Sequence, residues 1–471
     1  MSRKTTKQPE TETSESKTGV DELVPIYRRW LPNQVVERLV KETKERFYSR
    51  LLPPILVLWG FIFQRLNHDH SCDAAWSYLS SDAVDEQFRP DKPRPRRLSE
   101  STSAYCQARQ RLPLSVAQGA LRETAQALHL ELGEAALWYG HRVNLFDGST
   151  LRLKATPALT EHYGVASNQH GPSHWPLMRI VAGFDLFSGV VTEVAEGPYQ
   201  NSEHTLAVQV IRDLDANWVH VGDRNFGVYH ILQAVVGSQS DIVVRLKVTQ
   251  ARRLAQQRLR PGIDLDVVWS PSRFDKCESD LPTPPVAGRL IYRRLEKEGF
   301  RPIDLYLFTT LTDREQFPLE EIIALYGQRW IAELDLRHVK TTLHMEVLDG
   351  KSVDIVCKEL LLGLLAYNLL RGLMATAAVQ AGRSPLELSL AKCWRRTTDA
   401  CRSLPPGTSA STVERVLARL LVRLSNCVLP KRKRERFEPR AVWGRPRVYP
   451  TIKGSRDEAK QAWLDSMKPD S

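Results

Sequence analysis

The sequence contains few cysteines, and none of them belongs to a recognisable metal or redox motif. Seven cysteines are scattered over 471 residues without a Cys-x-x-Cys pair, which gives no support to a zinc ribbon or a redox motif. A GxxxxGK[ST] segment is also missing, so an ATP-driven motor of the P-loop type is unsupported. A sparse, odd number of cysteines is typical of a reducing compartment. We therefore expect a cytoplasmic protein.

Long uninterrupted apolar runs are also lacking. Residues 51–66 are broken by two prolines, and residues 360–379 contain Asn368 and Arg371. An arginine in the middle of a membrane span is costly, so a buried core helix is the better interpretation of the second run. Residues 1–19 lack the apolar core of a signal peptide and are expected to form a disordered tail. We expect no membrane association.

Positive charge is what the sequence has in excess. The formal net charge is +11 and the sequence pI is about 9.3, which favours a polyanionic partner. This surplus does not separate DNA from RNA or from an anionic membrane, and a basic protein without a nucleic-acid role stays an alternative. The length predicts roughly two to four domains.

The periodicity of apolar residues changes along the chain and suggests its organisation. Helical spacing precedes residue 141, and three strands, a helix, a strand and a helix follow, which indicates a mixed sheet with helices on its faces. The segment SAYCQARQRLP predicts a short helix opening at Ser101 or Ser103, whose polar side chains belong either to a solvated face or to a DNA contact. We expect the following regions: a tail (1–19), a helical N-terminal region (20–140), a core (141–248), a β-rich insertion (249–318), a second part of the core (319–385) and a helical, basic C-terminal region (386–471).

Two aspartates stand where predicted strands end. Asp147 follows the alternating segment RVNLF, and Asp223 follows NWVHVG. Open sheets with helical crossovers tend to carry ligands at the carboxyl ends of their strands. For either residue alone, a turn-forming aspartate after a strand is the simpler interpretation.

A long helix starting at Pro318 and running to about Met345 carries the third acid. On a wheel of about 100° per residue, one face within roughly 80° holds a single acid among cations and an aromatic, and its members are Tyr326, Arg329, Glu333, Arg337 and Lys340. Asp335 lies on the far side, so we expect its replacement by asparagine to be nearly silent. A solvated helix with an Arg329–Glu333 ion pair is the competing interpretation.

Three distant acids in a basic protein suggest metal-dependent chemistry on phosphodiesters. Magnesium prefers oxygen ligands, takes few carboxylates and leaves room for a substrate phosphate. Two such ions about 3.5–4 Å apart activate an attacking oxygen and stabilise a leaving one. Three converging carboxylates without metal would repel one another and raise their pKa values.

The helix also carries a family motif. The spacing Tyr326-x2-Arg329-x3-Glu333-x6-Lys340 resembles the Tyr-Arg-Glu-Lys motif of the IS-four type insertion-sequence transposases, and Trp330 stands beside the arginine as in that family. FDGST and VGDRNFG resemble the regions of their first and second catalytic aspartates, and RPRVYP resembles their C-terminal tails. The similarity runs over residues 103–450.

The resemblance implies a fold class and a reaction. The implied fold is α/β, with a ribonuclease H-like mixed-sheet core interrupted by a mainly β insertion, an α-helical N-terminal domain and a helical, basic C-terminal region. The implied reaction is cut-and-paste transposition by a DDE transposase, in some relatives through a DNA hairpin. Relatives act as a homodimer in a synaptic complex on double-stranded DNA, namely terminal inverted repeats and target DNA.

The resemblance also implies roles for individual residues. Asp147, Asp223 and Glu333 would bind two Mg²⁺ ions, for which Mn²⁺ can substitute, and would be the catalytic residues. The DNA-binding residues would be Tyr326, Arg329, Lys340, Arg337 and Trp330. Some relatives stack a flipped base on a tryptophan of the insertion, where this chain has Trp269. The N-terminal region would bind the inverted repeats, with clusters such as Arg94, Arg96 and Arg97 on phosphates.

Other interpretations stay open on sequence alone. A structure-selective DNA nuclease with a ribonuclease H fold would use the same three acids without strand transfer. An inactive, transposase-derived DNA-binding protein would keep the fold only. A zinc enzyme based on His162, His170 and His174 has no cysteine or obvious further ligand beside it, so surface histidines are the simpler interpretation.

Overall fold

The computed structural model describes most of the chain between residues 25 and 466. The described residues are 25–27, 29–44, 51–67, 69–81, 84, 99–168, 171–273, 275, 282–296, 302–404, 408–430 and 454–466. The expectations for residues 1–19, for Arg94, Arg96, Arg97 and His170, and for the basic tail after residue 430 lie outside them. Contacts divide the chain into one unit of residues 1–293 and 305–430 and another of residues 294–304 and 431–471. The second unit contains α16 (Arg456–Ser466).

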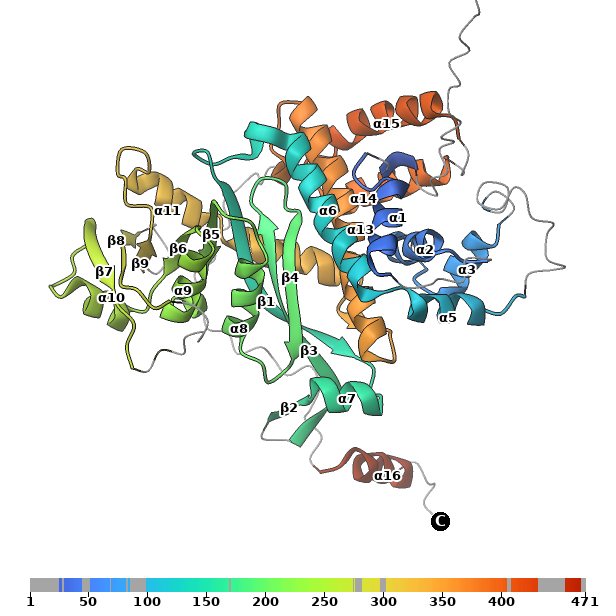
Figure 1. Cartoon of the computed structure of the whole chain (residues 1–471). Coiled ribbons are helices and arrows are strands. Elements are labelled where there is room, and N and C mark those ends of the chain that lie inside the picture. The colour runs from blue at the N-terminus through green and yellow to red at the C-terminus, as the bar shows by residue number, and fades with distance from the viewer. Residues whose placement is uncertain are drawn as a thin grey trace, which may run out of the picture. The chain divides into compact units, whose positions relative to one another are not determined.

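A mixed sheet forms the centre of the first unit (Figure 1). Strands β1 (Arg142–Leu153), β3 (Gly171–Asp185) and β4 (Val191–Pro198) form an antiparallel meander. β5 (Trp218–Gly222) then pairs parallel with β1, and β6 (Asp241–Arg245) pairs parallel with β5. Three antiparallel strands followed by two helix–strand crossovers are the order expected of a ribonuclease H-like core, so the predicted fold class is confirmed.

Two hydrophobic cores cover the two faces of this sheet. Along β1, Val143 and Leu145 belong to one core and Phe146 belongs to the other, as the alternation of a strand requires. The Phe146 core is formed with α8 (Glu203–Arg212) and α9 (Tyr229–Gly237). Ser202 caps α8, since its Oγ accepts a hydrogen bond from the backbone N–H of His204 at 3.2 Å.

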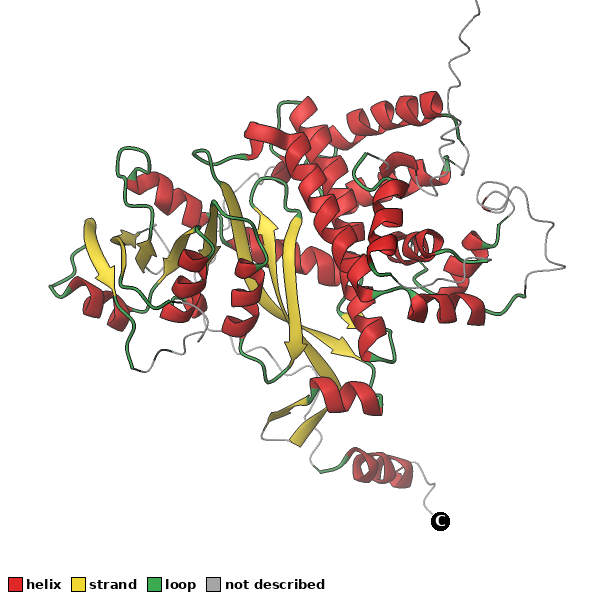
Figure 2. Cartoon of the chain, in the orientation of Figure 1, coloured by secondary structure: helices red, strands yellow, loops and turns green. Residues whose placement is uncertain are grey.

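The strands between residues 249 and 318 continue the same sheet. The order runs from β6 through β9 (Ile303–Thr309) and β8 (Val286–Leu295) to β7 (Ile263–Trp269), with β9 antiparallel to β6. Figure 2 shows these strands as the yellow group beyond β6. They are preceded by the short helix α10 (Val248–Ala255). Val267 and Trp269 of β7 and Val286 and Leu290 of β8 pack in the same core as α8 and α9.

Helices from both ends of the first unit build the opposite layer. The N-terminal helices are α1 (Asn33–Glu42), α2 (Pro54–Leu66), α3 (Cys72–Leu79), α5 (Ser103–Arg111) and α6 (Leu114–Leu132). They share one hydrophobic core with α13 (Val353–Gln380), α14 (Leu390–Arg402) and α15 (Ala410–Ser425). The apolar run around Asn368 is thus a buried core helix, as expected. Among the described helices, none has the length and apolar character needed to cross a membrane.

The predicted long glutamate helix is in fact interrupted. It consists of α11 (Leu319–Gly327), α12 (Trp330–Arg337) and a π-helical turn over His338–Thr342. Residues Gln328 and Arg329 stay close to helical geometry between the two helices. The prediction of a single helix was therefore wrong, although the chain keeps its direction well enough for the expected face to survive.

Asp335 lies on the side of α12 away from Glu333, as predicted, and it is buried there. The helical wheel gives the direction of a side chain and not what covers it. Because loss of a buried, paired carboxylate costs stability, the prediction that Asp335→Asn is nearly silent stays a prediction for the chemistry and not for the fold.

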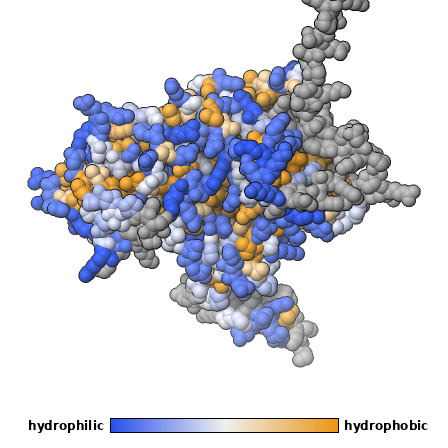
Figure 3. Space-filling model, in the orientation of Figure 1, coloured by the Kyte–Doolittle hydropathy of each residue, from blue (hydrophilic) through white to orange (hydrophobic). Residues whose placement is uncertain are grey.

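Smaller elements complete the first unit. The segment containing His174, expected as a loop, is the beginning of β3, which pairs with β2 (Val165–Asn168) after α7 (Pro157–Tyr163). β10 (Val347–Leu348) pairs parallel with the far end of β1. On the face drawn in Figure 3, hydrophobic side chains form small patches between hydrophilic ones. Short 3₁₀ turns cover Pro25–Tyr27, Gly133–Ala136, Arg224–Phe226 and Pro385–Glu387.

Candidate active site

The two predicted aspartates lie on neighbouring strands, where β5 ends and β1 continues. β1 and β5 are parallel with Leu145 opposite Val221, and two residues further along each chain are Asp147 and Asp223. Asp223 follows the end of β5 as predicted, whereas Asp147 lies within β1, which runs on to Leu153. Asp147 Oδ1 accepts from the N–H of Gly148 at 2.9 Å, and Asp223 Oδ1 accepts from the N–H of Asn225 in the following turn at 2.8 Å. The sheet register therefore brings together acids that are far apart in the sequence.

The electrostatics of Asp147 show that Glu333 faces the same place. The pKa of Asp147 is raised to about 6, mainly by burial and also by the carboxylates of Asp223 and Glu333, against the opposing effects of the Gly148 N–H and of Arg329. Like charges disfavour ionisation only over short distances. Helix α12, which carries Glu333, packs against β1, which carries Asp147. Asp223 and Glu333 are thus both near enough to Asp147 to raise its pKa.

The Arg329–Glu333 ion pair, expected if this helix face were merely solvated, is also present. Arg329 Nη2 donates to Glu333 Oε1, and the Glu333 side chain is half exposed. Within the described residues, no three histidine, cysteine or acidic side chains converge tightly enough to hold a metal ion. Glu333 therefore raises the pKa of Asp147, while one of its own carboxylate oxygens is hydrogen-bonded to Arg329.

The other predicted site residues lie around these acids. Tyr326 is largely buried, and burial raises its pKa whereas Arg329 and Arg245 lower it. Lys340 Nζ donates to Ser149 Oγ at 3.2 Å and to the carbonyl of Thr150 at 3.1 Å, both on β1 just beyond Asp147.

Two further residues of the predicted face are exposed. Arg337, at the end of α12, is exposed to solvent. Trp330 is 52% exposed, which is unusual for a tryptophan and leaves its indole ring accessible. Both remain candidates for contacts with a large ligand.

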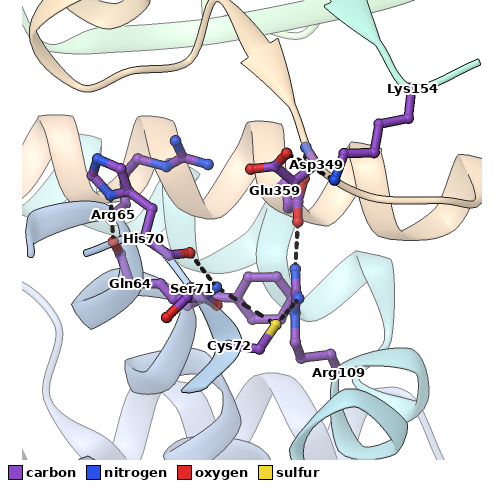
Figure 4. Close-up of a pocket in the computed structure, with 11 residues that line it drawn as sticks. Gln64, Arg65, His70, Ser71, Cys72, Arg109, Lys154, Asp349 and Glu359 are labelled. Carbon is purple, nitrogen blue, oxygen red and sulfur yellow. Dashed lines mark hydrogen bonds and ion pairs between the residues drawn. The ribbon is translucent and has the colours of Figure 1, made fainter. Parts of the chain in front are cut away.

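The α5 segment has a structural role that the sequence left open. Arg109 is buried, and its Nη2 donates to Glu359 Oε1 of α13 at 2.5 Å (Figure 4). Glu359 Oε2 in turn accepts from the N–H groups of Asp349 and Gly350 at 3.0 and 2.9 Å. This cluster lines a cavity of about 320 Å³ between α2, α3, α5 and α13. Arg109 therefore ties α5 to α13 and is neither solvated nor available for a DNA contact.

The base-stacking role implied for Trp269 does not fit the geometry. Its ring is 1% exposed and packs edge-on against Phe308 at 4.9 Å between centroids, so it is not accessible to a base.

His162 lies in α7 and His174 in β3, and both are exposed, as expected of surface histidines.

Comparison with known proteins agrees with the geometry. The Transposase DDE domain family matches residues 138–369, the stretch that carries all three acids. The chain is 29% identical over 355 residues to the transposase InsG for insertion sequence element IS4 from Escherichia coli (strain K12), covering 74% of this chain and 78% of that protein. These matches support an IS4-type DDE transposase. A putative transposase, InsZ, from the same organism is 31% identical over 125 residues, which is 26% of this transposase and 42% of InsZ.

One similar solved structure is a piggyBac transposase synaptic complex with hairpin DNA. It has 10% sequence identity and a TM-score of 0.41, covering 86% of this transposase and 87% of that chain.

Sequence reasoning overlooked the residues that support the aspartates. Glu203 was noted only as a negative charge in the first turn of a helix, yet its carboxylate accepts a hydrogen bond from Asn225 Nδ2 at 2.9 Å. No local pattern links positions 203 and 225. Only the pairing of strands and helices in the sheet reveals this contact.

Proposed function

We propose that this DNA-cleaving and strand-transferring enzyme works through Asp147, Asp223 and Glu333 as its catalytic carboxylates. The observation that supports this most directly is the field at Asp147, whose pKa is raised to about 6 by burial together with Asp223 and Glu333. A site where carboxylates destabilise one another's charges gains most from a cation. Asp223 follows the carboxyl end of β5, which is also where sheets of this kind carry ligands.

The donor set fits hard divalent cations. Three carboxylates supply the oxygen ligands that Mg²⁺ prefers, and we propose two Mg²⁺ ions, replaceable by Mn²⁺. Bound there, the ions would activate the attacking oxygen and stabilise the leaving oxygen of a phosphodiester. For Glu333 to join the aspartates as a ligand, its carboxylate has to leave Arg329.

The cations of the glutamate segment are proposed to hold the DNA backbone. Arg329, once released from Glu333, and the exposed Arg337 would pair with phosphate oxygens. Tyr326 and Lys340 would hold the DNA backbone beside the aspartates. Lys340 already contacts β1, and Tyr326 lies near enough to Asp223 for that carboxylate to raise its pKa. The exposed Trp330 offers a surface on which a base can stack.

The partners follow from the same reaction. We propose that the enzyme acts as a homodimer in a synaptic complex that pairs two terminal inverted repeats and inserts them into target DNA by cut-and-paste transposition. The N-terminal helical region would contribute to end recognition. The site of action would be nucleoid DNA in a bacterial cytoplasm.

The decisive experiment replaces each acid in turn. Asp147→Asn, Asp223→Asn and Glu333→Gln are each expected to abolish cleavage of a duplex carrying the transposon end, while binding of that duplex in a calcium buffer is retained. Glu414→Gln, at an exposed position of α15, is the matched control and should cleave normally. Retained cleavage in any of the three would remove that residue from the site.

Product analysis separates the alternatives. Transfer of the cut end into a target plasmid is expected for the transposase, whereas free hydrolysis products alone would indicate a structure-selective nuclease. A wild-type protein that binds the duplex but neither cuts nor joins it with Mg²⁺ or Mn²⁺ would indicate an inactive descendant.

A further inference from the structure

A fourth carboxylate joins the segments that carry the two aspartates. Glu203 opens α8, and its Oε2 accepts a hydrogen bond from Asn225 Nδ2 at 2.9 Å. The backbone N–H of the same Asn225 donates to Asp223 Oδ1 at 2.8 Å. One asparagine therefore connects the Glu203 carboxylate to the Asp223 carboxylate.

The same α8 turn holds the Asn225 backbone from a second side. His204 Nε2 lies 2.8 Å from the carbonyl oxygen of Asn225. Asn225, in the turn after β5, is thus bound through its side chain by Glu203 and through its backbone carbonyl by His204. A loop held at both points has little freedom to rotate its aspartate away.

Glu203 also touches the segment of the first aspartate. A Cβ atom built on Gly148 would lie 2.8 Å from Cδ of Glu203 and 3.0 Å from its Oε1, closer than real contacts allow. Gly148 follows Asp147 directly and donates its N–H to that carboxylate. The glycine of FDGST therefore leaves the space into which the Glu203 carboxylate fits.

Both oxygens of Glu203 are already occupied by groups of the protein. Oε2 accepts from Asn225, and Oε1 lies 3.4 Å from Nη1 of Arg179 on β3. Arg179 also stacks over the ring of Tyr199, with its guanidinium carbon 5.0 Å from the ring centroid. A carboxylate engaged in this way is suited to hold its neighbours in place rather than to bind a metal itself.

We infer that Glu203 is a positioning residue that sets the spacing between Asp147 and Asp223 for cation binding. It contacts the residue after the first aspartate and, through Asn225, the second aspartate. This inference rests on the proposed function, since it assumes that the two aspartates share a metal site. Residues that orient metal ligands typically change metal affinity by 10–100-fold when they are removed.

The test measures Mn²⁺ binding to the full-length protein by isothermal titration calorimetry, without DNA. Glu203→Ala is expected to weaken Mn²⁺ binding by roughly 10–100-fold while the unfolding midpoint in a chelator stays close to that of the wild type. Asn225→Ala removes the same link from the other end and should give a similar loss. Glu321→Ala, an exposed first-turn glutamate of α11, is the matched control and should bind like the wild type.

A conservative variant identifies the contact that matters. Glu203→Gln keeps an acceptor for Asn225 and should recover most of the Mn²⁺ affinity. An equal loss in Glu203→Gln and Glu203→Ala would overturn the assignment of the Asn225 hydrogen bond as the positioning contact.

The outcomes also separate this inference from the function on which it rests. If Asp147→Asn lowers Mn²⁺ affinity but Glu203→Ala and Asn225→Ala do not, the positioning role is wrong and the metal site stands. If Asp147→Asn leaves Mn²⁺ binding unchanged, the proposed metal site itself fails, and the role of Glu203 fails with it.

Discussion

Arg371 Nη2 donates to Asp335 Oδ1 at 2.7 Å in the interior of the protein. Both side chains are almost completely buried, and the hydroxyl of Tyr367 donates to the same oxygen at 3.0 Å. Asp335 belongs to α12, two residues after Glu333, whereas Arg371 belongs to the apolar helix α13. This ion pair therefore fixes the helix that carries the proposed third catalytic acid.

Removing one member of this pair should destabilise the fold. Asp335→Asn leaves the Arg371 guanidinium buried without a countercharge, and breaking a buried pair in this way costs about 3–5 kcal/mol. The free energy of unfolding from urea titration measures the loss. Asp335→Leu combined with Arg371→Met replaces both charges and should recover much of the stability. A loss below about 1 kcal/mol in the single variant would show that the pair is worth no more than a surface ion pair.

Gly189 provides a second test of the same arginine. Its φ is +70°, and a Cβ atom there would lie 1.7 Å from Nη2 of Arg371. Gly189→Ala should therefore cost a backbone penalty of about 1–2 kcal/mol and, in addition, displace Arg371 from Asp335. Gly382→Ala is the matched control, since Gly382 has a φ of +60° with open space around it. Urea titration of both variants should show a clearly larger loss at Gly189, and equal losses would contradict a tight fit of Arg371.

Asp147 should make the metal-free protein less stable as the pH rises. Its folded pKa of about 6 lies above its ordinary value of 3.8, so the folded protein holds a proton that the unfolded chain has already released between these values. The free energy of unfolding then falls as the pH rises through this window and levels off above about pH 6. At about 1.36 kcal/mol per pKa unit, the loss is at most about 3 kcal/mol.

The comparison with a neutral side chain isolates this effect. Asp147→Asn carries no charge at any pH and should be more stable than the wild type near pH 8 in a chelator, but similar to it near pH 4. Thermal unfolding at the two pH values measures both differences. A variant that is less stable than the wild type at both values would contradict the unfavourable charge at Asp147.

Lys340 should contribute one phosphate contact to DNA binding. Lys340→Ala is expected to weaken binding of the transposon end and to reduce the slope of log K against log salt by about 0.9. Ser149→Ala removes the hydroxyl group that Lys340 contacts on β1 and should leave the slope unchanged. Filter binding over a range of salt concentrations measures both. An unchanged slope in Lys340→Ala would mean that the Lys340 ammonium group contacts β1 and no DNA phosphate.

The aspartates could be predicted because their positions follow from local patterns. Alternation in RVNLF predicted the strand that carries Asp147, although that strand runs on to Leu153 and does not end at the aspartate. The strand NWVHVG does end just before Asp223. Parallel pairing of the two strands then brings the aspartates together. Helical spacing also predicted the face that Arg329 shares with Glu333, and these two side chains are indeed in contact.

The remainder depends on contacts that no local pattern encodes. Asp335 and Arg371 are 36 residues apart. In the sequence, Asp335 lies on the face of the helix opposite Glu333 and Arg371 lies in an apolar run, and nothing local pairs the two. Glu203 and Asn225 are likewise joined only when the start of α8 lies beside the turn that follows β5. The break between α11 and α12 escaped because Gln328 and Arg329 keep nearly helical angles, so the apolar periodicity barely changes across it.

Hydrogen bonds between β6 and β9 have a consequence for protein engineering. Residues 249–318 are hydrogen-bonded to the central sheet through β9, whose Thr309 pairs with Val243 of β6. This stretch therefore cannot be removed or transferred as an independent domain. Deleting it would uncover a row of unpaired backbone groups along β6, an open strand edge that invites aggregation. Chimeras between related enzymes should therefore exchange β6 together with the strands that follow it.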